Sequence, residues 1–357
     1  MRSAHRSILR DWILIVSSCC AAVGCDDDSN ADSDVDASMM RPDSAISEGG
    51  DAGLLDAEVM TDAEPMPAAR WLEDCPADTF ETRRVELEGV SLSVVCRGSG
   101  PTVLLLHGFP EFSLSWSEVM DALAGEFRLI APDQRGYNTS DKPEAVEDYV
   151  LGLLVEDMVQ LIDHVSDDPV LVVGHDWGGP VAWGLAHHQT ANVRGMLSTN
   201  GPHPVRIAHL LATDEAQQEA SSYFETFRSD NAERFITPRT IEAFFDGAIS
   251  EDLLPAYREA WAQPGAITGG LNWYRANAFD VMSMTEVSPA LSETIAVPVA
   301  VLWGLADTAL LPQNAEGLDV FAGDITVRTL EGVDHWIEHR APEEVAAEVR
   351  ALDERTR

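Results

Sequence analysis

A carboxylate stands at a position where a tight turn would expose it for reaction. Asp176 lies at the centre of the pattern Gly-x-Asp-x-Gly, between Gly174 and Gly178, directly after an apolar run that predicts a buried strand. A strand, this turn and then a helix make up the nucleophile elbow, whose middle residue is usually serine. A carboxylate there can attack an sp³ carbon that bears a leaving group and form an alkyl ester with the enzyme. The alternative is that Asp176 only caps the helix that follows it.

Two further residues continue the chain order nucleophile, acid, base. Asp307 follows one predicted strand and His335 follows the next. Because the carboxyl ends of parallel strands meet at one edge of a sheet, we expect these side chains to lie together. His335, oriented by Asp307, would activate the water that hydrolyses the ester. His175 is expected to be structural, and Asp334 and Glu338 are rival orienting acids.

A second loop is expected to supply hydrogen-bond donors. The run His107–Glu111 comes at the end of the predicted strand Thr102–His107. The backbone N–H of Phe109 and that of Trp177, next to the nucleophile, would form an oxyanion hole. This hole would hold the negative oxygen that appears when water attacks the Asp176 ester. A plain turn at the end of a strand is the alternative.

At these residues the chain resembles the epoxide hydrolases of the α/β-hydrolase fold, in the subgroup with an aspartate nucleophile. The resemblance extends from about residue 80 to about residue 350 and includes His107–Pro110, Asp133–Tyr137, Ser140–Pro143 and Gly174–Gly179. It implies a helical cap with two tyrosines, and the cap segments Ser222–Phe227 and Asn272–Arg275 match those of the family. By this resemblance Tyr223 and Tyr274 would hold the epoxide oxygen, whereas most buried tyrosines are only core aromatics.

Tyrosine phenols are suitable donors for an epoxide that is opened by the Asp176 carboxylate. Opening an epoxide leaves a strongly basic alkoxide, and tyrosine, with an ordinary pKa near ~10, is protonated at neutral pH and can donate to it. The expected reaction converts a small apolar epoxide and water into a vicinal diol through the Asp176 ester, without a metal or an organic cofactor. The apolar side chains expected to bind the substrate are Pro110, Phe227 and Trp273.

Two other functions remain open at this point. A haloalkane or haloacid dehalogenase would use the same Asp176 ester but needs N–H donors around a halide, of which Trp177 could supply one. A surface lipoprotein that keeps the fold and binds without turnover is the other alternative. Assays with epoxides, chloroalkanes and fluoroacetate would separate these functions.

The elements that must position these residues alternate along the chain. Apolar runs bounded by turn residues predict strands, the first two as an antiparallel hairpin split by Gly89: Arg84–Glu88, Ser91–Arg97, Thr102–His107, Arg128–Asp133, Val170–His175, Val193–Asn200, Val297–Gly304 and Ile325–Leu330. The later strands are continuous Val- and Leu-rich runs, typical of strands buried on both faces. Helical patterns lie between them at Trp116–Ala124, Leu154–Val165, Gly179–His188, Gln313–Phe321 and Pro342–Asp353.

This alternation predicts an α/β fold with a mostly parallel eight-stranded sheet and helices on both faces. The core is expected in two parts, residues 76–204 and 289–357. Residues 205–288, between them, show helical patterns, many aromatic residues and no clear strand. We expect this insertion to form a helical cap over the carboxyl edge of the sheet, where open α/β sheets bind their ligands.

The amino terminus has the parts of an export signal over residues 1–25. Three arginines precede a short apolar run and a stretch of small residues that ends at Cys25. The apolar run is shorter than the ~20 residues that a spanning helix needs. Ala22–Cys25 resembles a bacterial lipobox, in which Cys25 would carry the lipid; Cys19 and an uncleaved anchor are the alternatives. The protein is thus expected in the cell envelope, with this lipid as its only membrane attachment.

The net charge and the cysteine content bear on the expected binding partners, the linker and the disulfide. The chain has 357 residues and a formal net charge of −38, which disfavours nucleic-acid binding because phosphate backbones would be repelled. Residues 26–75 are acidic and poor in bulky side chains, which predicts a flexible linker. Beyond the signal, only Cys75 and Cys96 remain, and an oxidising compartment would permit a disulfide between them. Two buried thiols are the alternative, and no Cys/His spacing indicates a metal site.

Overall fold

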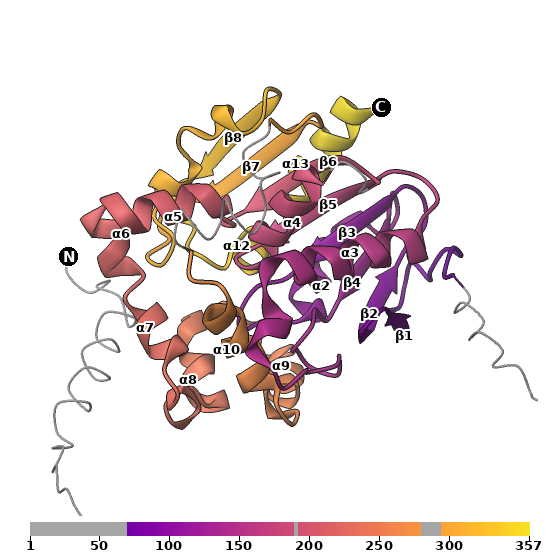
Figure 1. Cartoon of the computed structure of the whole chain (residues 1–357). Coiled ribbons are helices and arrows are strands. Elements are labelled where there is room, and N and C mark those ends of the chain that lie inside the picture. Colours follow the sequence, from indigo (N-terminus) through magenta and orange to yellow (C-terminus); the bar gives the residue numbers. More distant parts are fainter. Residues whose placement is uncertain (1–69, 189–191, 280–293) are drawn as a thin grey trace, which may run out of the picture.

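Apolar runs of the sequence form the eight strands of one mostly parallel sheet (Figure 1). The computed structural model describes residues 70–188, 192–279 and 294–357. The strands are ordered β1-β2-β4-β3-β5-β6-β7-β8, and β2 runs antiparallel to β1 and to β4 while all other neighbours are parallel. Every expected strand is present, with its ends shifted by a few residues: β1 (Glu81–Leu87), β2 (Val90–Arg97), β3 (Thr102–Leu106), β4 (Arg128–Pro132), β5 (Val170–His175), β6 (Val193–Thr199), β7 (Val299–Gly304) and β8 (Ile325–Leu330).

Helices cover both faces of this sheet. One face packs against α3 (Leu151–Val165) and α4 (Gly178–His187), and the other packs against α2 (Ser117–Leu123), α12 (Ile337–Arg340) and α13 (Pro342–Thr356). The central strands β3, β4 and β5 are buried along their whole length as a result. This double coverage explains why they consist almost entirely of apolar residues.

Two expectations about local structure are wrong. β8 is not buried on both faces, because it is the last strand of the sheet and Val327 in its middle is 45% exposed. Gln313–Phe321 does not form one helix but two short 3₁₀ turns, η6 (Pro312–Ala315) and η7 (Leu318–Val320). Gly317 separates them with a φ of 65°, a left-handed conformation that ends a right-handed turn.

The insertion between β6 and β7 is helical, as expected. Its helices are α5 (Pro204–Thr213), α6 (Glu215–Ala220), α7 (Tyr223–Arg228), α8 (Pro238–Glu242), α9 (Leu254–Ala262) and α10 (Ala266–Ala276), with the 3₁₀ turns η3 (Ala232–Arg234) and η4 (Ala243–Phe245). Over the described residues 204–279 it contains no strand. Figure 1 shows α7, α8, α9 and α10 grouped together below the sheet in that view. The end of the expected cap, the expected signal and lipidation site, and most of the expected linker lie outside the described residues.

The described end of the expected linker, residues 70–75, packs on the core instead of extending freely. Trp71 is 1% exposed, and its backbone N–H donates to the carbonyl oxygen of His164 at 3.0 Å. The guanidinium groups of Arg83 and Arg128 lie over its indole ring at 4.3 and 5.8 Å. An aromatic ring between two cations gives this segment a fixed attachment that acidic composition alone does not reveal.

A disulfide between Cys75 and Cys96 ties the same segment to β2, across a sequence separation of 21 residues. Replacing both residues, Cys75→Ser with Cys96→Ser, is expected to lower the free energy of unfolding by about 3 kcal/mol, because the crosslink restricts the unfolded chain. Urea unfolding of the two proteins measures the difference. Reducing agent should destabilise the natural protein alone, and equal stability of both proteins would contradict the prediction.

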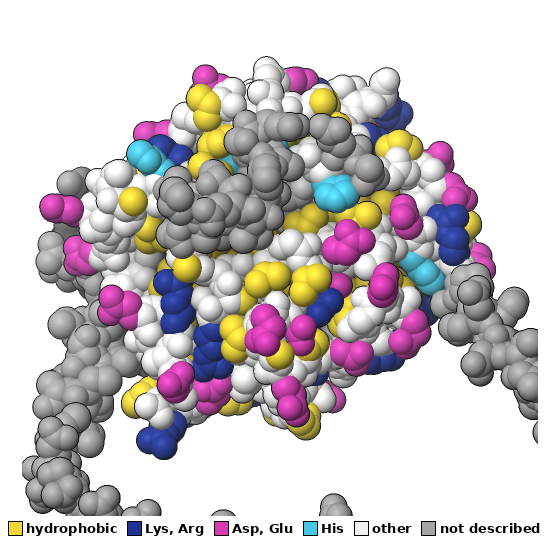
Figure 2. All heavy atoms as spheres, in the orientation of Figure 1, with side chains coloured by type: hydrophobic (Ala, Val, Ile, Leu, Met, Phe, Trp, Pro, Cys, Tyr) yellow, Lys and Arg dark blue, Asp and Glu magenta, His cyan; other side chains and the backbone are white. Residues whose placement is uncertain are grey.

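The charged surface carries the acidic excess of the sequence. On the face shown in Figure 2, Asp and Glu side chains are spread widely, with fewer Lys and Arg side chains between them. Among the described residues, no helix combines the length and the apolar character that a bilayer crossing requires.

Candidate active site

Asp176 occupies the tip of a sharp turn between β5 and α4. Its backbone has a φ of 46°, which is uncommon for a residue other than glycine and typical of strained functional turns. The glycines of the motif are required by close packing: a Cβ at Gly178 would collide with the carbonyl oxygen of Leu106, and a Cβ at Gly174 with that of Gly178. The sequence therefore folds here into a turn that only this spacing of glycines permits.

The structure brings the three predicted triad residues together. Asp307 follows β7, His335 follows β8, and the His335 Nδ1–H donates to Asp307 Oδ2 at 2.8 Å. The other ring nitrogen, Nε2, lies 3.7 Å from Asp176 Oδ2. Of the two rival acids, Asp334 accepts instead from the backbone N–H of Trp336, and Glu338 lies beside His175. Asp307 is therefore the acid that contacts the imidazole.

Asn200, at the end of β6, is a residue of this site that the sequence analysis missed. Its side-chain amide donates to Asp307 Oδ2 at 2.7 Å, and its Oδ1 accepts from the backbone N–H of Gly304 at 2.8 Å. The backbone N–H groups of Ala309 and Leu310 donate to the other oxygen of Asp307 at 2.8 and 2.9 Å. Both oxygens of the acid are thus fixed, and the position of Asn200 at the carboxyl end of a strand is the signal that could have found it.

The two expected oxyanion-hole donors both point at Asp176. The backbone N–H of Phe109 donates to Asp176 Oδ1 at 2.8 Å, and the backbone N–H of Trp177 also hydrogen-bonds the carboxylate. A Cβ at Gly108 would collide with the Asp176 side chain, which explains the glycine in this loop. One carboxylate oxygen is thus held by N–H donors, while Oδ2 faces His335.

The ionisable groups of the site shift one another's pKa values. Burial alone would lower the pKa of His335, but the charge and hydrogen bond of Asp307 and the charge of Asp176 raise it to about 9. Burial raises the pKa of Asp176, against the effect of His335, His175 and the two N–H donors. For Asp307 burial also acts upward, but His335 and the hydrogen bonds of Leu310 and Asn200 bring its pKa below the ordinary value. At neutral pH the resting site therefore holds a protonated imidazole between two carboxylates.

The two cap tyrosines and Asp176 line the same pocket. Tyr223 begins α7 and Tyr274 lies in the last turn of α10, and their ring centroids are 6.2 Å apart. The empty space of the pocket, open solvent at its mouth included, is about 260 Å³, and its walls are Asp176, Trp177, Pro180, Pro202, Ile207, Tyr223, Phe224, Tyr274, Phe279 and Leu310. Burial, together with the nearby Asp176 charge, raises the pKa of both phenols well above the ordinary value. Both hydroxyls therefore stay protonated and can donate.

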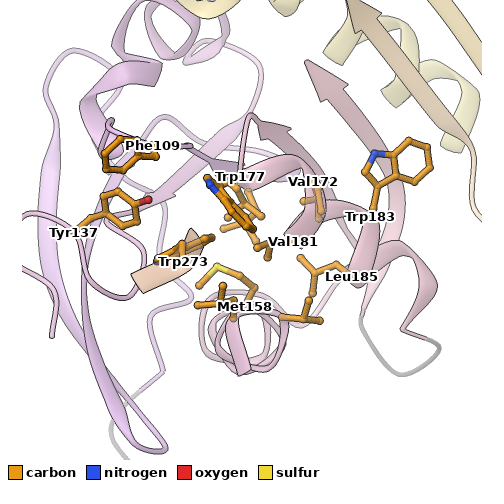
Figure 3. Close-up of a cluster of buried hydrophobic side chains, with 14 of the residues drawn as sticks. Phe109, Tyr137, Met158, Val172, Trp177, Val181, Trp183, Leu185 and Trp273 are labelled. Atoms are coloured by element: carbon orange, nitrogen blue, oxygen red, sulfur yellow. The ribbon is translucent and has the colours of Figure 1, made fainter. Parts of the chain in front are cut away.

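Three side chains expected to bind the substrate are not among the residues that line this pocket. Trp273 is fully buried and donates to the carbonyl oxygen of Arg135 at 2.9 Å, because successive residues of a helix point about 100° apart and Tyr274 takes the pocket side. Figure 3 shows Trp273 and Trp177 packed among buried apolar side chains.

The other two lie behind the pocket wall. The ring of Phe227 stands 5.0 Å from that of Tyr274 and 5.3 Å from that of Phe109, so it supports the wall from behind. Pro110 lines a neighbouring pocket together with Phe109 and Trp261. The Trp261 Nε1–H donates to the carbonyl oxygen of Pro110 at 2.6 Å, and this bond holds Pro110 at the neighbouring pocket.

Among the described residues, one group has side chains of the types that bind metals: Glu111, His175 and Glu338, all fully buried. His175 Nδ1 lies 3.0 Å from Glu111 Oε2, and its Nε2 lies 2.9 Å from the carbonyl oxygen of His335. Both ring nitrogens of His175 are therefore occupied: Glu111 and His175 form a bonded pair beside His335, and Glu338 Oε2 lies 3.4 Å from His175 Nε2. His175 thus has the structural place that the sequence predicts for it.

Comparison with known proteins identifies the family to which the chain belongs. Residues 101–338 match the family model described as alpha/beta hydrolase fold. The chain is 35% identical to the AB hydrolase superfamily protein YfhM of Bacillus subtilis, over 74% of this chain and 95% of that protein. It is 32% identical to Epoxide hydrolase 2 of Caenorhabditis elegans, over 72% of this chain and 76% of that one.

Solved structures agree with these relatives. One epoxide hydrolase of the alpha/beta hydrolase superfamily, from metagenomes of hot environments, superposes with a TM-score of 0.69 at 32% identity. The superposition covers 77% of this chain and 98% of that one. By its sheet, its inserted helices and these matches, the chain belongs to the alpha/beta hydrolase fold family.

Proposed function

We propose that this hydrolase converts small apolar epoxides into vicinal diols. The observation that carries the proposal is that Asp176 and two phenols, those of Tyr223 and Tyr274, line one pocket. The similarity to proteins named epoxide hydrolases supports it. A carboxylate supplies the nucleophile, and the phenols supply what an opening epoxide needs, namely donors for its oxygen.

The first step forms an ester. Asp176 Oδ2, the oxygen that Phe109 does not hold, attacks an epoxide carbon, and the C–O bond of that carbon breaks. The electron pair goes to the oxygen, which accepts hydrogen bonds from Tyr223 and Tyr274 and takes the proton of one of these phenols; that phenol regains a proton from solvent. The product of this step is a hydroxyalkyl ester of Asp176.

The second step hydrolyses the ester. His335, neutral at this stage and oriented by Asp307, removes a proton from water, and the resulting hydroxide attacks the ester carbonyl carbon. The negative charge builds up on the oxygen that faces the N–H groups of Phe109 and Trp177. The bond between the carbonyl carbon and Oδ2 then breaks, Oδ2 leaves with the substrate and takes the proton from His335, and the diol is released; the water oxygen stays in the Asp176 carboxylate.

The pocket indicates the kind of substrate. Apart from Asp176, the described residues of its walls carry aliphatic and aromatic side chains and no other carboxylate or cation. An uncharged epoxide with an apolar substituent fits this lining.

Replacing each phenol tests the assignment. Tyr223→Phe and Tyr274→Phe are each expected to slow ester formation by about 100-fold, because each removes a donor that acts on the developing alkoxide. Rapid-quench measurements with a small apolar epoxide give this rate. Turnover of chloroalkanes or fluoroacetate but not of epoxides would instead identify a dehalogenase, and binding without any turnover would identify a non-catalytic protein.

We also propose that the protein is exported and held at a membrane by a lipid on Cys25. The disulfide supports export, since such bonds persist mainly in oxidising compartments. Cys25→Ser is expected to move the protein from the membrane fraction to the aqueous fraction of the cell envelope. Cys19→Ser is the matched control and should leave the distribution unchanged; an unchanged distribution in both variants would contradict the proposal.

A further inference from the structure

Two arginines link the helices that carry the phenols. Arg228 is the last residue of α7, which begins with Tyr223, and its side chain reaches the end of α10. Its Nε–H donates to the carbonyl oxygen of Tyr274 at 2.9 Å, and its Nη2 donates to those of Asn277 and Ala278 at 3.0 and 3.1 Å. The Arg228 side chain thus joins α7, which carries Tyr223, to the turn of α10 that carries Tyr274.

Arg228 binds carbonyls at the end of α10 and just after it: that of Tyr274 belongs to the last turn, Asn277 is the C-cap and Ala278 follows it. The last carbonyl groups of a helix have no intrahelical N–H donor, and the partial negative charge there favours a cation. Arg228 is half-buried, and its guanidinium also lies 5.2 Å from the centroid of the Phe224 ring. Phe224 in turn packs edge-on against Tyr274 with ring centroids 5.3 Å apart. The turn of α10 that carries Tyr274 is therefore fixed from α7 on two sides.

The charge of Arg228 also acts on the phenols. Burial and the charges of Asp176 and Asp307 raise the pKa of Tyr223, whereas the hydrogen bond with Tyr274 and the positive charge of Arg228 act in the opposite direction. A cation near Tyr223 favours negative charge on its phenol. Such charge builds up only while the phenol donates to the oxygen of an opening epoxide.

Arg275 provides a comparison within the same pair of helices. It belongs to α10 and donates to the carbonyl oxygen of Ser229, the residue after α7, at 3.0 Å. Its guanidinium also makes two bonds to the Glu233 carboxylate, at 2.9 and 3.0 Å, and one to Asn272 Oδ1 at 3.1 Å. Arg275 therefore links the helices as Arg228 does, but its charge is balanced by an acid that it binds directly.

We propose that Arg228 is a positioning residue for epoxide opening, which holds the last turn of α10 against α7 so that Tyr223 and Tyr274 face Asp176 together. This inference rests on the proposed function of the two phenols. The hydrogen bonds of Arg228 go to carbonyl oxygens at the end of α10, and Arg228 is not among the described residues that line the pocket. Its effect is confined to the step in which the phenols act.

Single-turnover kinetics separate that step from the second one. In Arg228→Gln, ester formation is expected to slow about 10- to 50-fold, less than for loss of a direct donor, through misplacement of both phenols. Hydrolysis of the ester should stay within about twofold, because His335 and the N–H donors carry it. Arg275→Gln, the matched control, should lose comparable thermal stability but keep ester formation within about threefold.

The outcomes are distinguishable from failure of the proposed function. If Tyr223→Phe and Tyr274→Phe slow ester formation but Arg228→Gln does not, or slows both steps equally, only the role of Arg228 is overturned. If the tyrosine variants leave ester formation unchanged, the proposed function itself fails. Should Arg228→Gln not fold, Arg228→Lys decides: it keeps the charge but loses bonds to carbonyls, and we expect a loss of about 3- to 10-fold in ester formation alone. An unchanged rate in that variant would overturn the role of Arg228.

Discussion

Asp176→Asn is expected to lower epoxide turnover by about 10⁴-fold or more, the largest loss from any single substitution in this protein. The neutral amide keeps the shape of the side chain but cannot attack carbon to form the ester. It can still accept the N–H bond of Phe109 through its oxygen, so the fold of the turn should survive. Diol production under saturating epoxide measures the loss.

A neighbouring acid supplies the control for this substitution. Asp334 precedes His335 in the sequence, but its carboxylate binds the Trp336 N–H and the Arg340 guanidinium at 3.1 Å each, on the outside of the site. Asp334→Asn should therefore keep turnover within about threefold, as most surface substitutions do. If Asp176→Asn retained turnover like this control, an ester on Asp176 could not be an intermediate.

Isotopic labelling identifies the atom that reacts. With enzyme in excess over epoxide in heavy-oxygen water, the water oxygen attacks the ester carbonyl carbon and remains in the Asp176 carboxylate. Mass spectrometry of the Asp176 peptide should show this label after one turnover. Label found only in the diol would mean that water attacks the epoxide directly.

The side chains of the candidate triad could be placed from sequence because each follows a strand with a clear apolar pattern. β5, β7 and β8 lead directly into the segments that carry Asp176, Asp307 and His335, and the parallel direction of these strands brings their ends to one edge. The Asp307–His335 distance of 2.8 Å agrees with that reasoning. Phe109 could be placed at this edge for the same reason, because its loop follows β3.

Positions that depend on contacts between distant segments could not be placed in this way. Trp273 and Tyr274 are adjacent aromatic residues, and the burial of Trp273 against Arg135 decides that only Tyr274 faces the pocket. Arg228 gives no local signal, since its partners are carbonyls of another helix. Asn200 is one polar residue among many at strand ends until its amide is seen on Asp307.

His335→Gln is expected to stop the reaction after its first step and to lower turnover by about 10³-fold or more, because no base remains to activate water. Asp176 and both phenols are intact in this variant, so the ester should still form and accumulate to one equivalent per protein. Intact-protein mass spectrometry should show an increase equal to the mass of the epoxide. His209→Gln, on the exposed side of α5, is the control and should show neither effect.

The pH dependence of the natural protein follows from the same charges. In the resting site His335 has a pKa raised to about 9, in part by the charge of Asp176. Forming the ester removes that charge, so the pKa of His335 falls and the imidazole releases its proton at the stage where a base is needed. The rate of ester hydrolysis should therefore rise with pH through a midpoint below about 9. In Asp176→Asn, the pKa of His335 measured by NMR should be lower than in the natural protein. A pKa that stays at about 9 in Asp176→Asn would mean that Asp307 alone sets it, and the loss of charge on Asp176 would not explain how the protonated imidazole becomes a base.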